Sequence, residues 1–300
     1  MSAVIQTQNL TKFYGKHRGV VELNLEVEQG EVFGFLGPNG AGKTTTIRLL
    51  LDLIHPTSGS AEVFGKDVHV DSLEIRRRIG YLPGDLATYE NLTGHESLTY
   101  FANLQGGVNE KYTEALAERL TLDLTRPIRT LSTGNRQKVG LVQAFMHQPE
   151  LVILDEPTSG LDPLVRQEFS RIVDETKADG RTVFLSSHVL AEVERMADRV
   201  GIVREGRLVV EDSVESLKQK AVRRLEFQFG EPVPLEPFQG LPGVREVIAE
   251  DSVIQCVVVG SVDALIKVAA QFEVVNITSH EADLEAIFLD YYKEGEDNAE

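Results

Sequence analysis

Residues Gly37-Pro38-Asn39-Gly40-Ala41-Gly42-Lys43-Thr44-Thr45 form a glycine-rich stretch close to the beginning of the chain. They fit the phosphate-binding pattern G-x-x-x-x-G-K-[ST] at every fixed position. The apolar segment 32–36 before them predicts a buried strand, and segment 45–51 after them predicts the first turns of a helix. A glycine-rich loop between a strand and a helix is the context in which this pattern binds the phosphates of a nucleotide.

The loop offers several hydrogen-bond donors to one anion. Its glycines allow a sharp turn that directs successive backbone N–H groups at a phosphate, and the helix N-terminus adds a partial positive charge. Lys43 is expected to reach the β- and γ-phosphates, and the Thr44 hydroxyl to be a ligand of Mg²⁺. A glycine-rich turn that binds nothing would not require a lysine and a hydroxyl residue at these two positions.

Length and composition describe an ordinary globular chain. Three hundred residues suit one large domain or two moderate ones. No stretch approaches the roughly 18 consecutive apolar residues of a membrane helix, and the first residues have neither the basic region nor the apolar core of a signal peptide. The single cysteine, Cys256, lies in the apolar run 253–259 and is expected to be a small buried side chain. These features predict a cytosolic protein.

The charge of the chain argues against one class of partner. The formal net charge is −17, and residues 222–300 contribute much of it, with 5 Lys and Arg against 16 Asp and Glu. Non-specific binding of nucleic acid depends on neutralising phosphates, for which such an acidic chain is poorly suited. We therefore expect no nucleic acid among its partners, although this argument does not address local basic patches.

Strand and helix patterns alternate along most of the chain. Strands are predicted at 3–10, 20–27, 61–64, 151–154 and 182–185. The region from about 73 to 124 is mostly helical by pattern, with Thr93 and Asn109 as N-caps. Strands separated by helices predict a parallel or mixed sheet, whose ligands bind at the carboxyl ends of the strands. The glycine-rich loop, Asp155-Glu156 and Ser186-Ser187-His188 all follow such strands.

The character of the sequence changes near residue 222. Four short strands are predicted at 224–229, 244–248, 253–259 and 274–278, with helices at 262–272 and 282–292. This pattern predicts a small acidic α+β domain over 222–300, for which a ferredoxin-like arrangement is one option. Residues 294–300 are expected to be a frayed acidic tail. The first domain is then 1–221, with a helical subdomain at about 85–150.

Two adjacent acids stand at the end of the apolar strand 151–154. In an enzyme that hydrolyses nucleotides, the first of such a pair, here Asp155, holds Mg²⁺, commonly through water. The second, Glu156, is placed to polarise the attacking water as a general base. Two acids at a strand end are by themselves more often solvated turn residues, but here they follow a complete phosphate-binding loop.

The motifs resemble, in type and order, those of the ATP-binding cassette subunits of ABC transporters, over residues 3 to about 220. Leu131-Ser132-Thr133-Gly134-Asn135 resembles the signature sequence of that family, usually L-S-G-G-Q, and the segment 151–158 resembles its second nucleotide motif. Ser159-Gly160-Leu161-Asp162 resembles its D-loop, and His188 its switch histidine. Tyr14 falls where the family stacks an aromatic ring on adenine.

The resemblance implies a fold, two ligands and a set of roles. The fold is an α/β P-loop nucleotide-binding cassette, with a mixed sheet core and a helical subdomain. The ligands are ATP and Mg²⁺, with Thr44 and Asp155 at the metal, Glu156 as the base, and His188 on the γ-phosphate and the attacking water. In the family, Ser132, Gly134 and Asp162 complete a site on a second subunit, so that a head-to-tail dimer, here a homodimer, encloses two ATP molecules. An ordinary helix N-cap is the other interpretation of Ser132.

Three positions depart from the family pattern. Thr133 replaces a glycine of the signature sequence, and Asn135 replaces a glutamine but keeps an amide. Gly84 stands where the family usually has a glutamine that touches Mg²⁺ and relays the nucleotide state to the membrane subunit. Since Gly84 has no side chain, we expect water or Asp85 to take that place.

The leading hypothesis is a Mg²⁺-dependent ATPase subunit that drives an integral membrane permease from the inner face of the cell membrane. Segment 85–101 is expected to contact the permease. Residues 200–218, the acidic second domain and Leu284-Glu285-Ala286-Ile287-Phe288 resemble exporters of drugs, lipids or polymers. The alternatives are an importer ATPase with a regulatory C-terminal domain, a soluble ATPase of the same superfamily acting without a permease, and a nucleotide-binding scaffold without turnover, which an intact Glu156 disfavours.

Overall fold

The structure is a computed structural model that describes residues 3–87, 89–220 and 222–280. The chain folds as two compact units, Met1–Glu211 and Asp212–Glu300. The sequence predicts a domain boundary after residue 221. The structure instead assigns residues 212–221 to the second unit. Among the described residues, no helix has the length and apolar character needed to cross a membrane.

The first unit contains two sheets. A four-stranded antiparallel sheet has the order β2-β1-β4-β5, from β1 (Ala3–Tyr14), β2 (His17–Glu28), β4 (Ser58–Val63) and β5 (Lys66–Asp67). A six-stranded sheet has the order β10-β9-β3-β8-β7-β6, from β3 (Val32–Leu36), β6 (Ile79–Leu82), β7 (Leu151–Asp155), β8 (Thr182–Ser187), β9 (Arg199–Arg204) and β10 (Arg207–Ser213). The strands from β9 to β6 pair in parallel, so their carboxyl ends lie at one edge.

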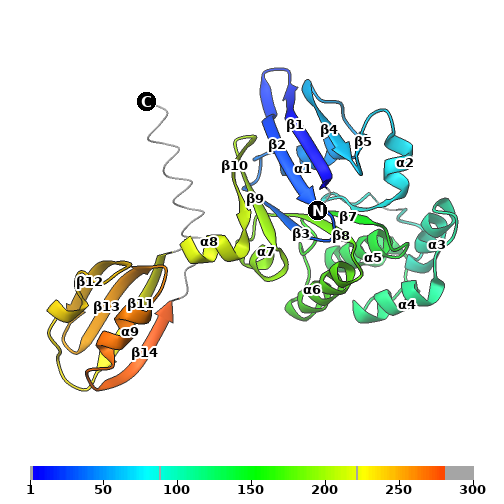
Figure 1. Cartoon of the computed structure of the whole chain (residues 1–300). Helices are drawn as coiled ribbons and strands as arrows, with labels where there is room; N and C mark the ends of the chain where they lie inside the picture. The colour runs from blue at the N-terminus through cyan, green and yellow to red at the C-terminus, as the bar shows by residue number, and fades with distance from the viewer. Residues whose placement is uncertain (1–2, 88, 221, 281–300) are drawn as a thin grey trace. The chain divides into compact units, whose positions relative to one another are not determined.

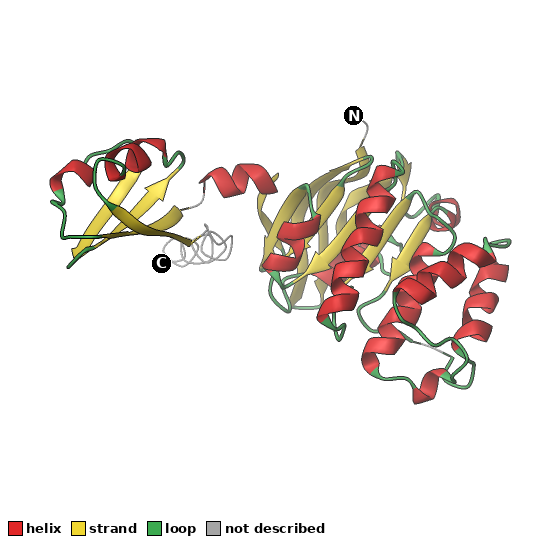
Figure 2. Ribbon diagram, turned by 90° about the horizontal axis from the view of Figure 1, so that it is seen from below, coloured by secondary structure: helices red, strands yellow, loops and turns green. Residues whose placement is uncertain are grey.

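The helices of the first unit are α1 (Lys43–Leu50), α2 (Ser72–Arg77), α3 (Gly94–Leu104), α4 (Glu110–Arg119), α5 (Thr133–Phe145), α6 (Pro163–Ala178) and α7 (Leu190–Met196), with a 3₁₀ turn η1 (Ile128–Thr130) before α5. Most of them lie between strands along the chain, but α3, α4 and α5 follow one another between β6 and β7. Figure 2 shows a group of helices beside the sheets, which the labels of Figure 1 identify as α3, α4 and α5. The predicted cassette of mixed sheets and helices is confirmed.

Local sequence explains where the helices of this group begin. The Thr93 hydroxyl accepts from the Glu96 N–H while the Glu96 carboxylate accepts from the Thr93 N–H, which is a complete capping box at the start of α3. The Asn109 side chain accepts from the Tyr112 N–H and caps α4 with this single hydrogen bond. Both N-caps are those that the sequence predicts.

One strand was wrongly assigned to the helical region. Segment 79–82 forms β6, which pairs in parallel with β7 at an edge of the six-stranded sheet. Its four residues, Ile79-Gly80-Tyr81-Leu82, are too few to show a period of two, so the pattern did not separate them from the helices around them. A side chain at Gly80 would place its Cβ 1.9 Å from the carbonyl oxygen of Ala144, so α5 packs directly on this strand.

The second unit is a small α+β fold. Helix α8 (Val214–Lys220) precedes a four-stranded sheet of order β12-β13-β11-β14, in which all neighbouring strands are antiparallel. The strands are β11 (Val222–Phe229), β12 (Val244–Glu250), β13 (Val253–Val259) and β14 (Val274–His280). This is the strand order of a ferredoxin-like sheet, but only the 3₁₀ turn η2 (Glu236–Phe238) stands where that arrangement has its first helix.

An apolar core supports this second sheet. Phe227, Phe229 and Phe238 are fully or almost fully buried, and α9 (Asp263–Ala269) contributes Leu265. Cys256 is 1% exposed, as the sequence predicts, and its burial raises the pKa of the thiol to about 11. The predicted helix at 282–292 and tail at 294–300 lie outside the described residues.

Candidate nucleotide-binding site

The glycine-rich loop turns sharply between β3 and α1. Gly40 and Gly42 have φ angles of +81° and +112°, which favour glycine. A side chain at Gly42 would place its Cβ 2.6 Å from the carbonyl oxygen of Gly19, and one at Gly37 would lie 2.5 Å from that of Val203. The loop is therefore packed between β2 and β9, and glycine at these positions is a steric requirement.

The N-terminus of α1 suits an anion. Gly42 is the N-cap residue and has no side chain to accept from the first N–H groups of the helix. The remaining loop residues surround this point: Pro38 accepts at its carbonyl oxygen from the Ala41 N–H, Asn39 is exposed, and Thr45 follows in the first turn. Backbone donors at the start of a helix are the groups that hold nucleotide phosphates, so the loop fits ATP.

Lys43 lies inside this loop and is only 6% exposed. Its Nζ donates to the carbonyl oxygens of Gly37 at 2.6 Å and Pro38 at 3.2 Å. The same nitrogen lies 3.2 Å from Oε1 of Glu156. The lysine that the sequence predicts for the phosphates thus lies directly beside the acid that it predicts as the base.

Two of the predicted groups meet at the end of β7. The Thr44 hydroxyl donates to Oδ2 of Asp155 at 2.7 Å, and the Ser186 hydroxyl donates to Oδ1 of the same carboxylate at 2.5 Å. Asp155 is 1% exposed. A threonine hydroxyl and a buried carboxylate side by side are oxygen ligands of the kind that Mg²⁺ takes, so these residues fit the ion. Burial, together with the charge of Asp155, raises the pKa of neighbouring Tyr81 to about 12.

Glu156 is the residue at which the site converges. Its Oε2 lies 2.8 Å from Nδ1 of His188, and its other oxygen faces Lys43. Its backbone has a φ of +51°, a conformation that costs energy for a residue with a side chain. The Glu156 N–H donates to the carbonyl oxygen and the hydroxyl of Ser186, both at 3.2 Å. The strained backbone is therefore held from the neighbouring strand.

Sequence reasoning missed two residues that support this acid. The sequence identifies Ser186 only as part of a strand end. In the structure β7 and β8 pair in parallel so that Asp155 lies opposite Ser186, and this parallel pairing is the signal that could have indicated the contact. Gln137, on α5, donates from Nε2 to the carbonyl oxygens of Glu156 at 3.1 Å and Pro157 at 3.2 Å. No sequence signal points to that contact, because it depends on how α5 packs on a turn 19 residues later.

The signature-like segment forms the start of α5. Ser132 is its N-cap, and the hydroxyl accepts from the Asn135 N–H at 3.3 Å. A Cβ at Gly134 would lie 2.4 Å from the carbonyl oxygen of Gly160, so this helix end packs against the D-loop-like turn. Asp162 caps α6 by accepting from the Val165 N–H at 3.0 Å. Among the described residues, neither Ser132 nor Asp162 makes a side-chain hydrogen bond to the phosphate loop of its own chain.

Tyr14 lies beside the phosphate loop, and Gly84 lies beside Asp155. Tyr14 is 44% exposed as a whole residue, and a Cβ at Gly19 would lie 3.0 Å both from its ring and from the Thr45 methyl group. An exposed ring next to the phosphate loop suits stacking on a base. A Cβ at Gly84 would lie 3.1 Å from Oδ2 of Asp155, so a side chain at position 84 would reach the predicted metal site.

Comparison with known proteins identifies the family. The ABC transporter family model matches residues 20–159. The bacitracin transport ATP-binding protein BcrA of Bacillus licheniformis is 43% identical over 234 residues, which cover 77% of this chain and 76% of that protein. The BcrA protein of Enterococcus faecalis is 39% identical, with 76% and 75% covered.

Solved structures agree with this assignment. The ATP-binding subunit of an ABC transporter shares 31% identity and a TM-score of 0.66, over 72% of this chain and 92% of that one. The dimeric ABC transporter cassette MJ0796, at 23% identity and a TM-score of 0.65 over 70% and 98% of the two chains, shows the same fold. The chain therefore belongs to the ABC transporter family, as an ATP-binding and ATP-hydrolysing subunit.

Proposed function

We propose that this chain hydrolyses Mg-ATP as a homodimer and thereby drives a separate membrane permease that exports a small molecule. The observation that carries the proposal is the placement of Glu156 between Lys43 and His188, beside the Thr44–Asp155 pair. Lys43 provides a positive charge for the phosphates, and Glu156 provides a base. His188 orients that base, and Thr44 and Asp155 provide ligands for a metal ion. The chain would work at the cytoplasmic face of the membrane, attached through the permease.

Each polar residue of the site has a separate task. The loop N–H groups and Lys43 would bind the phosphates, and Lys43 would exchange its contact with Glu156 for a phosphate oxygen. Glu156 would then hold the attacking water and accept its proton, while His188 fixes the direction of the carboxylate. Thr44 and Asp155 would hold Mg²⁺, which when bound neutralises charge on the phosphates. Tyr14 would stack on the adenine.

The second half of each site would come from another copy of the chain. Ser132 stands at the N-terminus of α5, where a hydroxyl and backbone N–H groups can hold an anion. Asp162 starts the next helix, beside the turn that packs on Gly134. Since one chain carries both the loop and this helix end, two identical chains related by a twofold axis would form two complete sites.

A groove in the first unit suits the permease contact. A cavity of about 270 Å³ is lined mainly by apolar side chains from the end of α1, β6, α3 and α5, including Leu51, Leu53, Tyr81, Phe101 and Met146. Tyr89 and Tyr100 are 51% and 43% exposed and lie edge to face, 5.3 Å apart, beside Phe101. These aromatic residues fall in the segment 85–101 that the sequence predicts as the contact.

The proposed direction of transport and the proposed class of transported compound rest on sequence similarity. Two similar proteins are named for bacitracin transport, and a third, from Escherichia coli and 37% identical, is named a probable multidrug ABC transporter. That last protein is much longer, since the match covers 38% of it. Together with the exporter-like segments 200–218 and 284–288, these names favour export of a drug-like compound over import.

Purification of the full chain from detergent-solubilised membranes of its own cells tests the function. We expect a membrane-spanning partner to co-purify, and Tyr100→Ala with Phe101→Ala to abolish its recovery without loss of ATP hydrolysis. A control substitution on the neighbouring helix α4, Lys111→Ala, should leave recovery unchanged. Recovery of ribosomes or DNA in place of a membrane protein would instead support the soluble ATPase.

A further inference from the structure

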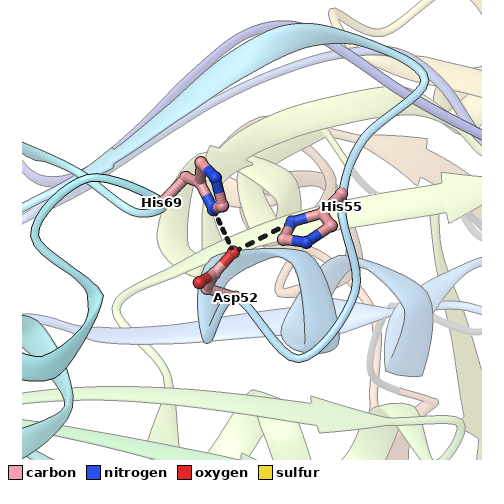
Figure 3. Close-up of side chains that lie close together, drawn as sticks. All are labelled: Asp52, His55 and His69. Carbon is pink, nitrogen blue, oxygen red and sulfur yellow. Dashed lines mark hydrogen bonds and ion pairs between the residues drawn. The ribbon is translucent and has the colours of Figure 1, made fainter.

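Three side chains outside the nucleotide site converge at the far end of α1. They are Asp52, directly after the helix, His55 in the following loop, and His69 in the connection between β5 and α2 (Figure 3). Nδ1 of His55 lies 3.2 Å from Oδ1 of Asp52, and Nδ1 of His69 lies 3.1 Å from the same oxygen. The ligand atoms of all three lie within 4.8 Å of one another.

We propose that Asp52, His55 and His69 bind a divalent transition metal ion of the Zn²⁺ type. Two imidazole nitrogens and one carboxylate are a donor set that Zn²⁺ takes in proteins, with water as the fourth ligand. Tetrahedral Zn²⁺ with bonds of about 2.0–2.1 Å separates its ligand atoms by roughly 3.3 Å. The two nitrogen–oxygen distances are already close to that value, so small rotations of exposed rings would open room for the ion.

The backbone around the three residues is fixed by other contacts. The Lys12 ammonium donates to the carbonyl oxygen of His55 at 2.6 Å. The N–H groups of His69 and Val70 donate to Oδ1 of Asp67, at 2.9 and 3.0 Å. The Asp52 side chain is 13% exposed, whereas the two histidines are about two-thirds exposed, at 67% and 66%. Because the imidazoles of His55 and His69 are accessible while Asp52 is nearly buried beneath contacts with them, an ion from solution can reach this site.

This site is distinct from the predicted Mg²⁺ site. Thr44 and Asp52 are eight residues apart along α1 and its end, which corresponds to about 12 Å along a helix axis. Imidazole nitrogens also select borderline transition metals, whereas Mg²⁺ prefers oxygen ligands. An ion here would join the end of α1 to the loop before α2, and would so brace the helix that begins at the phosphate loop.

The competing explanation is a hydrogen-bonded Asp–His cluster that binds no metal. Titration calorimetry with Zn²⁺ on the full chain separates the two, after treatment with chelator, without a histidine tag, and in excess Mg²⁺ to saturate Thr44 and Asp155. We expect one Zn²⁺ per chain, with affinity lowered at least about tenfold in His55→Ala and in His69→Ala. The exposed His95, outside the cluster, provides the matched control, and His95→Ala should bind like the unmodified chain.

A second measurement distinguishes loss of a metal ligand from loss of the fold. Asp52 has a φ of +51°, which asparagine also adopts readily, so Asp52→Asn should fold while losing a charged ligand. With Co²⁺ as the probe, the visible absorption of a tetrahedral ion should appear in the unmodified chain and weaken in Asp52→Asn. Equal Zn²⁺ affinity of the unmodified chain and the His55→Ala/His69→Ala double variant would overturn the proposal, as would no binding at all.

Discussion

At the scale of single residues, the chemistry depends on how Glu156 is held. Its backbone adopts a left-handed conformation that would relax if nothing opposed it. Ser186 binds its N–H, Gln137 binds its carbonyl oxygen, and Lys43 and His188 face its two carboxylate oxygens. Residues of α5 and β8 thus hold the backbone of Glu156, while Lys43 and His188 fix the direction of its carboxylate, before any water or phosphate takes part.

Replacing the base separates binding from turnover. Glu156→Gln keeps the size of the side chain and the contact with His188 but cannot accept a proton. We expect ATP binding to persist and hydrolysis to fall at least roughly 10²-fold, the scale of a lost general base. Fluorescent-nucleotide binding and phosphate release measure the two quantities. Turnover within a few-fold of the unmodified chain would rule out Glu156 as the base.

Lys43 is expected to act through binding. Lys43→Ala removes the ammonium from the phosphate loop, and ATP binding should be lost because a charge-assisted contact to the phosphates disappears. The exposed Lys111 on α4 provides the matched control for removal of one positive charge. Near-normal ATP affinity in Lys43→Ala would contradict the assignment of the loop.

At the scale of elements, α5 connects the signature-like segment to the base. The hydroxyl of its N-cap Ser132 accepts from the Asn135 N–H. Gln137, about one turn further on, donates to the carbonyl oxygens of Glu156 and Pro157. A shift of this helix therefore moves the backbone of the base. The arrangement offers a direct physical route by which events at the helix end reach the reacting atoms.

The side-chain N–H donor of Gln137 can be replaced by an acceptor oxygen with little change in the shape of the side chain. Gln137→Glu places a carboxylate against two carbonyl oxygens, so two hydrogen bonds of about 1 kcal/mol each become repulsive contacts. We expect turnover to fall roughly tenfold or more through misplacement of Glu156, with ATP affinity retained. Gln167→Glu adds the same charge at an exposed position of α6 and should leave turnover unchanged. Equal ATPase rates in the two variants would show that the contact does not position the base.

Much of the cassette is predictable because its elements have strong local signals. Short stretches of sequence are enough to identify the glycine-rich loop, the apolar strands and the N-caps Thr93 and Asn109. The strand β6 was missed because four residues carry too little periodicity, and Gln137 because its partner lies on another element. The site residues could be placed together only because parallel strands end at the same edge, a property of the fold and not of any one motif.

At the scale of the whole molecule, the two units have separate cores. The aromatic core of the second unit, with Phe227, Phe229 and Phe238, contains no residue of the nucleotide site. We propose that this unit regulates the ATPase or supports dimer formation. Its acidic character was foreseeable from composition, whereas the boundary at residues 211 and 212 was not, because β10 runs across it.

Truncation tests the independence of the first unit. Deleting the residues after Lys220 keeps β10 and α8 while removing the four-stranded sheet of the second unit. We expect Mg-ATP affinity to remain within about twofold, because less than 0.5 kcal/mol of binding energy should depend on the deleted part. Loss of nucleotide binding in a truncated chain with unchanged thermal unfolding would mean that the second unit belongs to the nucleotide site.

The proposed dimer depends on Ser132 of one copy contacting the γ-phosphate held by the other. Two substitutions probe this contact while keeping the helix cap, because aspartate and asparagine are both strong N-caps. In a Glu156→Gln background, Ser132→Asn should preserve assembly, whereas Ser132→Asp should bring a negative charge against a phosphate and prevent it.

Light scattering of these variants in the presence of ATP is the most direct test. The Glu156→Gln chain and its Ser132→Asn derivative should have twice the monomer mass with ATP and the monomer mass without it. The Ser132→Asp derivative should bind ATP but remain a monomer. If Glu156→Gln stays a monomer while saturated with ATP, or if the aspartate derivative dimerises as readily as the asparagine one, the shared nucleotide site is contradicted.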